Sequence, residues 1–111
     1  MTNTTVVNIK TSTYEALIDR TTIFGNPFPE WKWGRILCIR RHRSYFYNRL
    51  ERDPEFKRQV LSLQGKRIGC HCKPLPCHGD TIAEYLNSYA WIERIRNEQN
   101  KTGGEKQWSS R

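Results

Sequence analysis

The segment from Gly69 to Asp80, GCHCKPLPCHGD, concentrates the residues of this chain that are able to do chemistry. It holds three of the four cysteines and two of the three histidines in a chain of 111 residues. Thiolates and imidazoles are the ligands that zinc prefers, and they also serve as nucleophiles and bases in catalysis. This segment is therefore the first candidate for a functional site.

The spacing within this segment allows a metal site. Alternate residues of a strand share a face, so Cys70 and Cys72 are expected to point the same way. A loop with two prolines then turns the chain and brings the next Cys-His pair back toward the strand end. Since zinc takes four such ligands in a tetrahedron, we predict a zinc site made by Cys70, Cys72, Cys77 and His78. An iron–sulfur cluster is the lesser alternative, and the residues that could replace a ligand are Cys38, His42 and His71.

The same residue types also allow a catalytic interpretation. Cys77 lies near the expected start of a helix, where the helix dipole and the nearby Lys73 would lower the pKa of its thiol. Such a thiolate is a nucleophile, and His78 would be its base. Asp80 would orient the histidine, act as an acid or cap the helix. The third interpretation is structural, with the cysteines packed as small apolar groups.

A strand, a tight loop and a helix N-terminus also make a phosphate-binding corner, although the Walker pattern is absent. The chain has a net charge of +8, and residues 35–68 hold ten basic and three acidic side chains. A concentrated positive field attracts nucleic acid, nucleotides or another polyanion, although such a run is also typical of a solvated helix face. The candidate phosphate contacts are Arg40, Arg41, Arg43, Lys66, Arg67, Lys73 and Asn26.

Hydrophobic periodicity predicts the elements that position these residues. Strands are expected at Thr4–Lys10 and Lys66–Cys72, and Thr13–Arg20 fits either a short helix or a second strand. The three predicted helices cover Gly34–Leu50, Asp53–Gly65 and about Asp80–Trp91.

Side-chain patterns indicate which faces of these elements are buried. In the first predicted helix the inward stripe is Ile36, Ile39, Phe46 and Leu50. In the second, Asp53 suits the N-cap and Pro54 the first helical position. The breaker-rich loop before the first helix is expected to pack on the core through Phe24, Phe28, Trp31 and Trp33. For the two tryptophans, stacking on a base or a sugar is the alternative.

Length and composition fit one small globular domain with a modest core. No apolar run reaches the length of a membrane span and the N-terminus lacks a signal pattern, so we expect a cytoplasmic protein with reduced thiols and no membrane association. We predict a single α/β domain over residues 1–92, with a short sheet and about three helices. Residues 93–111 are expected to form a polar, flexible tail.

Two segments carry a resemblance to a known family. GNPF (Gly25–Phe28) together with LQGKRIGCHCKPLPCHGDTIAEYL (Leu63–Leu86) resembles the domain of unknown function 4326 family of bacteria and their phages. The resemblance covers roughly Val6–Asn87, but an Ile-Gly-Arg before GNPF is replaced by LIDRTTIF, with Arg20 in the arginine's place. It implies a compact α/β fold, a phage-type setting, and one site formed by GNPF and the Cys/His segment. It implies no reaction.

Three functions follow from these residues and the resemblance. The leading hypothesis is a nucleotide- or nucleic-acid-directed protein with a zinc site at the corner between the second long strand and the last helix. The second is a metal-free enzyme that uses a Cys77 thiolate with His78 on a nucleotide-like substrate. The third is a phage interaction protein that binds a host factor, in which the Cys/His cluster only stabilises the fold.

Overall fold

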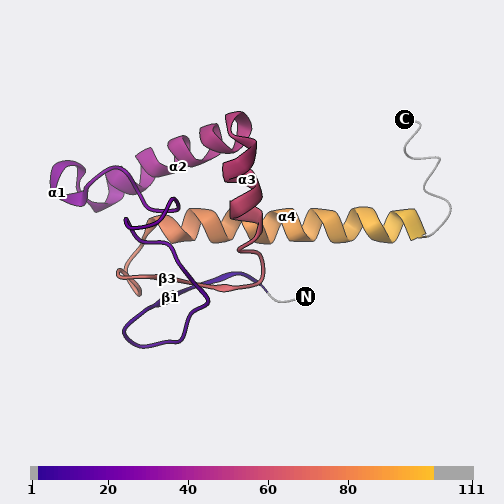
Figure 1. Cartoon of the computed structure of the whole chain (residues 1–111), viewed down its shortest axis with the longest axis horizontal. Helices are drawn as coiled ribbons and strands as arrows, with labels where there is room; N and C mark the ends of the chain where they lie inside the picture. Colours follow the sequence, from indigo (N-terminus) through magenta and orange to yellow (C-terminus); the bar gives the residue numbers. More distant parts are fainter. Residues whose placement is uncertain (1–2, 102–111) are drawn as a thin grey trace.

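The protein is described by a computed structural model over residues 3–101, and it has the predicted α/β architecture (Figure 1). The elements in chain order are β1 (Thr5–Asn8), β2 (Ala16–Leu17), α1 (Glu30–Trp33), α2 (Arg35–Arg52), α3 (Pro54–Leu61), β3 (Arg67–Cys70) and α4 (His78–Lys101). The segment Thr13–Arg20, which fitted a helix or a strand, contributes the short strand β2.

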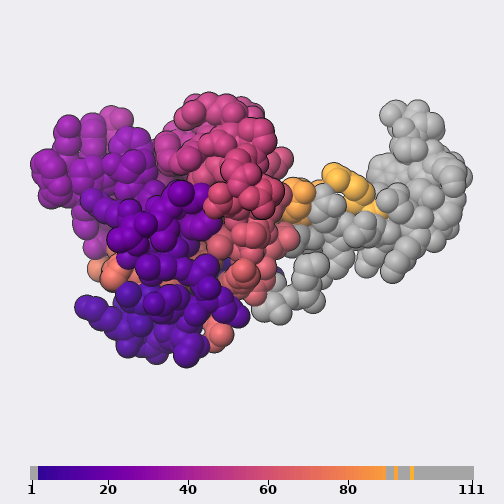
Figure 2. Space-filling view, viewed as in Figure 1, coloured from indigo at the N-terminus to yellow at the C-terminus, as the bar shows by residue number. Residues whose placement is uncertain are grey.

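The three strands form one parallel sheet in the order β1-β3-β2. Ile68 of the central strand pairs with Val6 on one side and with Ala16 on the other. Parallel strands need their faces covered. In Figure 1, α2 and α4 lie on the same side of the sheet, and α4 packs against both β1 and α2. Figure 2 shows the N-terminal part of the chain, in indigo and violet, over much of the viewed face.

The core lies between the sheet and the helices, and its largest fully buried side chains include Ile18, Phe46, Ile68, Ile82 and Leu86. The inward face predicted for α2 is partly wrong, because Ile36 is 61% exposed. The buried residues of α2 follow an i, i+4 row through Cys38, His42, Phe46 and Leu50. A search for apolar residues alone misses this row, because one of its four buried residues is a histidine.

The expected packing of the breaker-rich loop is also wrong at one residue. Trp31 is 85% exposed, and α1 has no buried residue. Phe24 packs against the core as expected. The loop also makes a close backbone contact, since a Cβ atom on Gly25 would lie 2.6 Å from both the Cα of Arg20 and the carbonyl oxygen of Asp19. Glycine is needed at this position because two backbones meet there.

The largest differences from the predicted helix bounds are at the C-terminal ends of α3 and α4. α3 begins after Asp53 as expected, and the Asp53 carboxylate accepts a hydrogen bond from the Phe56 amide at 3.1 Å. It ends at Leu61 rather than Gly65, because tighter turns follow it. α4 starts at His78 and continues to Lys101, so residues 93–101, expected in a flexible tail, are helical. The rest of that predicted tail, 102–111, lies outside the described residues.

Within residues 3–101, no helix combines the length and the hydrophobicity that crossing a membrane requires.

Candidate functional site

A pocket of about 320 Å³ lies where β2 and β3 end. In α/β proteins with parallel strands, ligands bind beyond the carboxyl ends of the strands, so this pocket is the candidate site. Its walls come from two parts of the chain that are far apart in sequence. The first runs from the residues after β2 through the GNPF loop and α1 to the start of α2, and the second runs from the end of β3 to the start of α4. The lining includes Asn26 of GNPF and all four predicted zinc ligands, Cys70, Cys72, Cys77 and His78.

Cys77 caps α4. Its Sγ atom accepts a hydrogen bond from the Gly79 amide at 3.2 Å, and the Asp80 carboxylate accepts one from the Cys77 amide at 3.1 Å. This reciprocal arrangement is a capping box, with cysteine in the position usually taken by serine or threonine. Asp80 is therefore the third residue of α4 rather than its cap, and its other oxygen pairs with Lys73 Nζ at 2.6 Å.

The pKa of the Cys77 thiol is raised, although the sequence predicted that it would be lowered. The side chain is 2% exposed, and its Sγ lies 3.4 Å from Cys70 Sγ, which is also buried. Burial, together with the hydrogen bond to Cys70, raises the pKa of Cys77 to about 12. The expected lowering by the helix dipole is thus outweighed by loss of solvent around the charged form.

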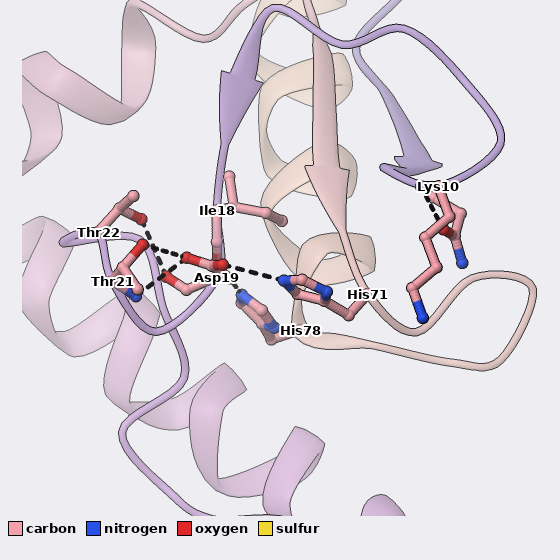
Figure 3. A network of polar contacts seen from close by, with 8 residues as sticks. Lys10, Ile18, Asp19, Thr21, Thr22, His71 and His78 are labelled. Carbon is pink, nitrogen blue, oxygen red and sulfur yellow. Dashed lines mark hydrogen bonds and ion pairs between the residues drawn. The ribbon is translucent and has the colours of Figure 1, made fainter.

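His78 links the start of α4 to the end of β2. Its Nε2 donates a hydrogen bond to the Ile18 carbonyl oxygen at 2.7 Å, as Figure 3 shows. Burial lowers the pKa of His78, and its ring meets the buried His42 ring edge-on with centroids 5.1 Å apart. The imidazole is therefore held neutral by its surroundings and its Nε2 is already engaged by backbone.

A second histidine faces the pocket with a carboxylate beside it. His71 Nε2 donates to Asp19 Oδ2 at 3.0 Å, and half of the His71 side chain is exposed (Figure 3). The Asp19 carboxylate also accepts hydrogen bonds from the Thr21 hydroxyl and amide. The bonds from Thr21, followed by that from His71, lower the pKa of Asp19 to about 2.

This Asp-His pair was not predicted as a unit. Sequence reasoning named His71 only as a replacement metal ligand and did not name Asp19. The local Asp-x-Thr pattern at Asp19–Thr21 indicates an Asx turn, but nothing in the sequence connects it to a residue 52 positions later.

Two arginines on the pocket wall also escaped prediction as site residues. Arg35 pairs with Glu30 at 3.2 Å, donates to the Pro76 carbonyl oxygen at 3.2 Å, and hydrogen-bonds the half-buried Cys72 side chain, which raises the Arg35 pKa. Arg20 lines the same pocket, and no hydrogen bond or ion pair is made by its guanidinium within residues 3–101.

The predicted zinc ligands line one pocket but do not form a coordination group in this arrangement. Within the described part of the chain, no set of three or more His, Cys, Asp or Glu side chains is placed to hold a metal ion. The sulfur atoms of Cys70 and Cys77 are close together, whereas Cys72 bonds to Arg35.

The predicted phosphate contacts are spread over separate surfaces. Asn26 lines the pocket, but its side chain is occupied: Nδ2 donates to the Cys38 carbonyl oxygen and Oδ1 accepts from the Phe28 amide. Arg67 opens β3, at the end away from the pocket, and pairs with Glu15. The other predicted basic residues also lie outside the pocket lining. Lys73 pairs with Asp80, and Arg43 pairs with Glu84. The remaining three are exposed: Arg40, Arg41 and Lys66.

These observations define a small α/β protein with a three-stranded parallel sheet and a pocket at the carboxyl ends of two strands. A family model described as "Domain of unknown function (DUF4326)" matches residues 4–88, and the chain belongs to this family, as the GNPF and Cys/His segments predicted.

One curated relative is an uncharacterized 12.4 kDa protein in the nrdA-td intergenic region of Enterobacteria phage T4. It is 37% identical over 82 residues, which cover 74% of this chain and 76% of the relative. No solved structure matches the chain.

Proposed function

We propose that this protein is nucleotide- or nucleic-acid-directed and that its pocket binds a phosphate-bearing ligand. The observation that carries the proposal is the unpaired guanidinium of Arg20 on the pocket wall. The pocket carboxylates do not neutralise it, because Asp19 bonds to His71 and Thr21 while Glu30 pairs with Arg35. Arginine offers a planar fork of donors that matches phosphate oxygens.

The size of the pocket supports a small ligand. About 320 Å³ lies at the lower end of the range typical of small-molecule sites. Apolar side chains and thiols share the lining with the charged residues, which suits a ligand with both an anionic group and a flat, less polar group. A nucleotide has this combination.

An enzymatic function is a second candidate, and the His71–Asp19 pair favours it. A carboxylate that accepts from a histidine fixes the ring and its tautomer, which prepares the other ring nitrogen to take or give a proton. His71 is exposed and Cys72 is half-buried, whereas Cys77 and His78 are held in buried hydrogen bonds. A metal-free reaction in this pocket would therefore use His71 and Cys72 in place of the Cys77 and His78 first considered.

Zinc bound by Cys70, Cys72, Cys77 and His78 stays a prediction. The 3.4 Å approach of two sulfur atoms favours it, and a zinc ligand role for His78 Nδ1 is compatible with the bond from its Nε2 to the Ile18 carbonyl. Cys72, however, would have to release Arg35. Elemental analysis of untagged protein purified without chelator tests it. One zinc per chain supports coordination, and zinc-free protein that is folded would remove it.

The test of the pocket is titration calorimetry with nucleoside mono-, di- and triphosphates, the matching nucleosides, and inorganic phosphate. Wild-type protein is expected to bind one of the phosphorylated compounds, and Arg20→Ala to weaken that binding at least about tenfold. Arg58→Ala is the control, because Arg58 is exposed and pairs with Glu55 on α3. Equal binding by Arg20→Ala and wild type, or no binding of any of these compounds, would reject the pocket and favour a protein-interaction role.

A further inference from the structure

A groove of about 460 Å³ runs along the outward face of α2 and shares no lining residue with the pocket. We call it the α2 groove. Its charged and polar residues are Arg40, Arg41, Ser44, Asn48 and Arg52, and its other lining residues are Phe28, Leu37 and Tyr45.

The polar residues of the α2 groove form a straight row. Arg40, Ser44, Asn48 and Arg52 are four residues apart, so each lies about one turn beyond the previous one. The row from Arg40 to Arg52 extends about 18 Å at 1.5 Å per residue. It therefore offers a cation at each end with two neutral hydrogen-bonding side chains between them.

The charge in the α2 groove is not neutralised. The lining contains no aspartate or glutamate. Within residues 3–101, Arg40 and Arg52 have no hydrogen-bond or ion-pair partner, and Arg41 has only the Trp33 ring, 3.8 Å from its guanidinium carbon. The other arginines of α2 all meet a carboxylate: Arg35 pairs with Glu30, Arg43 with Glu84 and Arg49 with Asp53.

Aromatic side chains stand beside these cations. Phe28 and Tyr45 contact each other edge-to-face in the groove wall, and the Tyr45 hydroxyl is fixed by a hydrogen bond from Arg49. A basic face that only aids solubility requires neither a groove nor aromatic walls. Cationic side chains interleaved with aromatic ones are typical of surfaces that bind nucleic acid.

We propose that the α2 groove binds the phosphate backbone of a nucleic acid, with Arg40, Arg41 and Arg52 contacting phosphates and Ser44 and Asn48 donating to their oxygens. Nucleic acid is favoured over an acidic protein surface because the charges follow a line. A strand carries a phosphate about every 3.4 Å, so an 18 Å row spans roughly five of them. Of the α2 arginines expected from sequence to contact phosphate, Arg40 and Arg41 line the groove and Arg43 does not, and Arg52 is added to them.

The experiment compares two variants of equal charge. The groove variant is Arg40→Gln, Arg41→Gln and Arg52→Gln. The control is Arg43→Gln, Arg58→Gln and Arg67→Gln, three exposed arginines that already pair with carboxylates. Binding to labelled single-stranded DNA, single-stranded RNA and duplex DNA is followed by fluorescence anisotropy over a series of salt concentrations. Circular dichroism checks that each variant is folded.

The wild type is expected to bind at least one of these nucleic acids, and its affinity should fall as the salt concentration rises. Comparison of the three nucleic acids identifies which of them binds. The groove variant should lose at least about tenfold in affinity, and on duplex its log–log salt slope should fall by about two to three, since each phosphate contact contributes about 0.9. The control should stay within about threefold of the wild type.

Three results would overturn the inference: no binding by wild type, equal losses in both variants, or equally tight, salt-dependent binding of poly-glutamate. Arg20→Ala leaves the groove intact, so its binding to nucleic acid separates a failure of the groove from a failure of the pocket.

Discussion

The Sγ atoms of Cys70 and Cys77 lie 3.4 Å apart and join the last residue of β3 to the residue that caps α4. Both side chains are at most 2% exposed. Two of the three clustered thiols are thus part of the core, which leaves Cys72 as the thiol of this cluster that solvent reaches more readily.

Cysteine reactivity should follow this burial. At about pH 7.5, iodoacetamide is expected to modify Cys72 first, while Cys70 and Cys77 react only as fast as the fold opens, because both side chains are at most 2% exposed. The Cys77 thiol, with a pKa of about 12, also holds almost no thiolate. Peptide mass mapping over time gives the order. Modification of Cys77 as early as Cys72 would restore the thiolate function first considered for it.

The buried His42 should make the protein less stable in acid. Burial lowers the pKa of His42 from 6.5 to about 3, and the unfavourable interaction that a protonated His42 would have with a protonated His78 adds to this lowering. The pKa of His42 is lower in the folded protein than in the unfolded chain, so between about pH 6.5 and pH 3 the unfolded chain binds a proton that the folded protein does not. The stability of the folded protein with a neutral His42 is therefore full above about pH 6.5 and is lost as the pH falls toward 3. The free energy of unfolding should fall by up to about 1.4 kcal/mol per pH unit from this group.

The variant His42→Phe separates this effect from other titrations. It removes the buried Nδ1 that has no hydrogen-bond partner and keeps a ring stacked on Phe46. In urea denaturation between about pH 7 and pH 4, the free energy of unfolding should change less with pH for this variant than for wild type. The control Asn48→Ala, which changes an exposed side chain without a titratable group, should keep the wild-type slope. An unchanged slope in His42→Phe would contradict the assignment.

Asn26 should be required for stability. Its side chain is 7% exposed and satisfies two backbone groups, the Cys38 carbonyl and the Phe28 amide. Asn26→Ala is expected to cost about 1–3 kcal/mol, since the Phe28 amide loses its acceptor. Asn26→Asp keeps that acceptor but places a negative charge against the Cys38 carbonyl oxygen. Its loss of stability should therefore be larger at neutral than at acidic pH.

Chemical denaturation of the Asn26 variants is compared with Asn48→Ala, which removes an exposed asparagine from α2. The control should lie within about 0.5 kcal/mol of wild type. A loss in Asn26→Ala no larger than in this control would show that the GNPF loop does not depend on the asparagine side chain.

Asp80 should stabilise the start of α4 as the partner of Cys77 in the capping box, rather than act as a catalytic residue. Asp80→Ala removes the acceptor for the Cys77 amide and should destabilise the fold by about 1 kcal/mol. Asp80→Asn keeps an acceptor and loses only the partly exposed ion pair with Lys73, so it should cost less than about 1 kcal/mol. High salt screens the ion pair, so the unfolding temperatures of wild type and Asp80→Asn should be closer together in high salt than in low salt.

The sequence by itself determined the fold class and most of the elements, although it did not predict α1 and left β2 open between a helix and a strand. Asp53 and Pro54 set the start of α3, and the runs before Asn8 and Cys70 form strands, because caps and side-chain alternation act between neighbours. The family, and the location of the Cys/His cluster beside the GNPF loop, also followed from motifs. What these signals share is a range of a few residues, within which the backbone leaves few alternatives.

Only the tertiary structure decided which of these residues are accessible. His71 meets Asp19 across 52 positions, and His78 bonds to Ile18 across 60. Burial raised the pKa of Cys77 against the helix dipole, and a carboxylate on α4 neutralised Arg43 but left Arg40 without a partner. Solvation and charge pairing depend on what packs against a residue, and that neighbour is set by the whole fold rather than by local spacing.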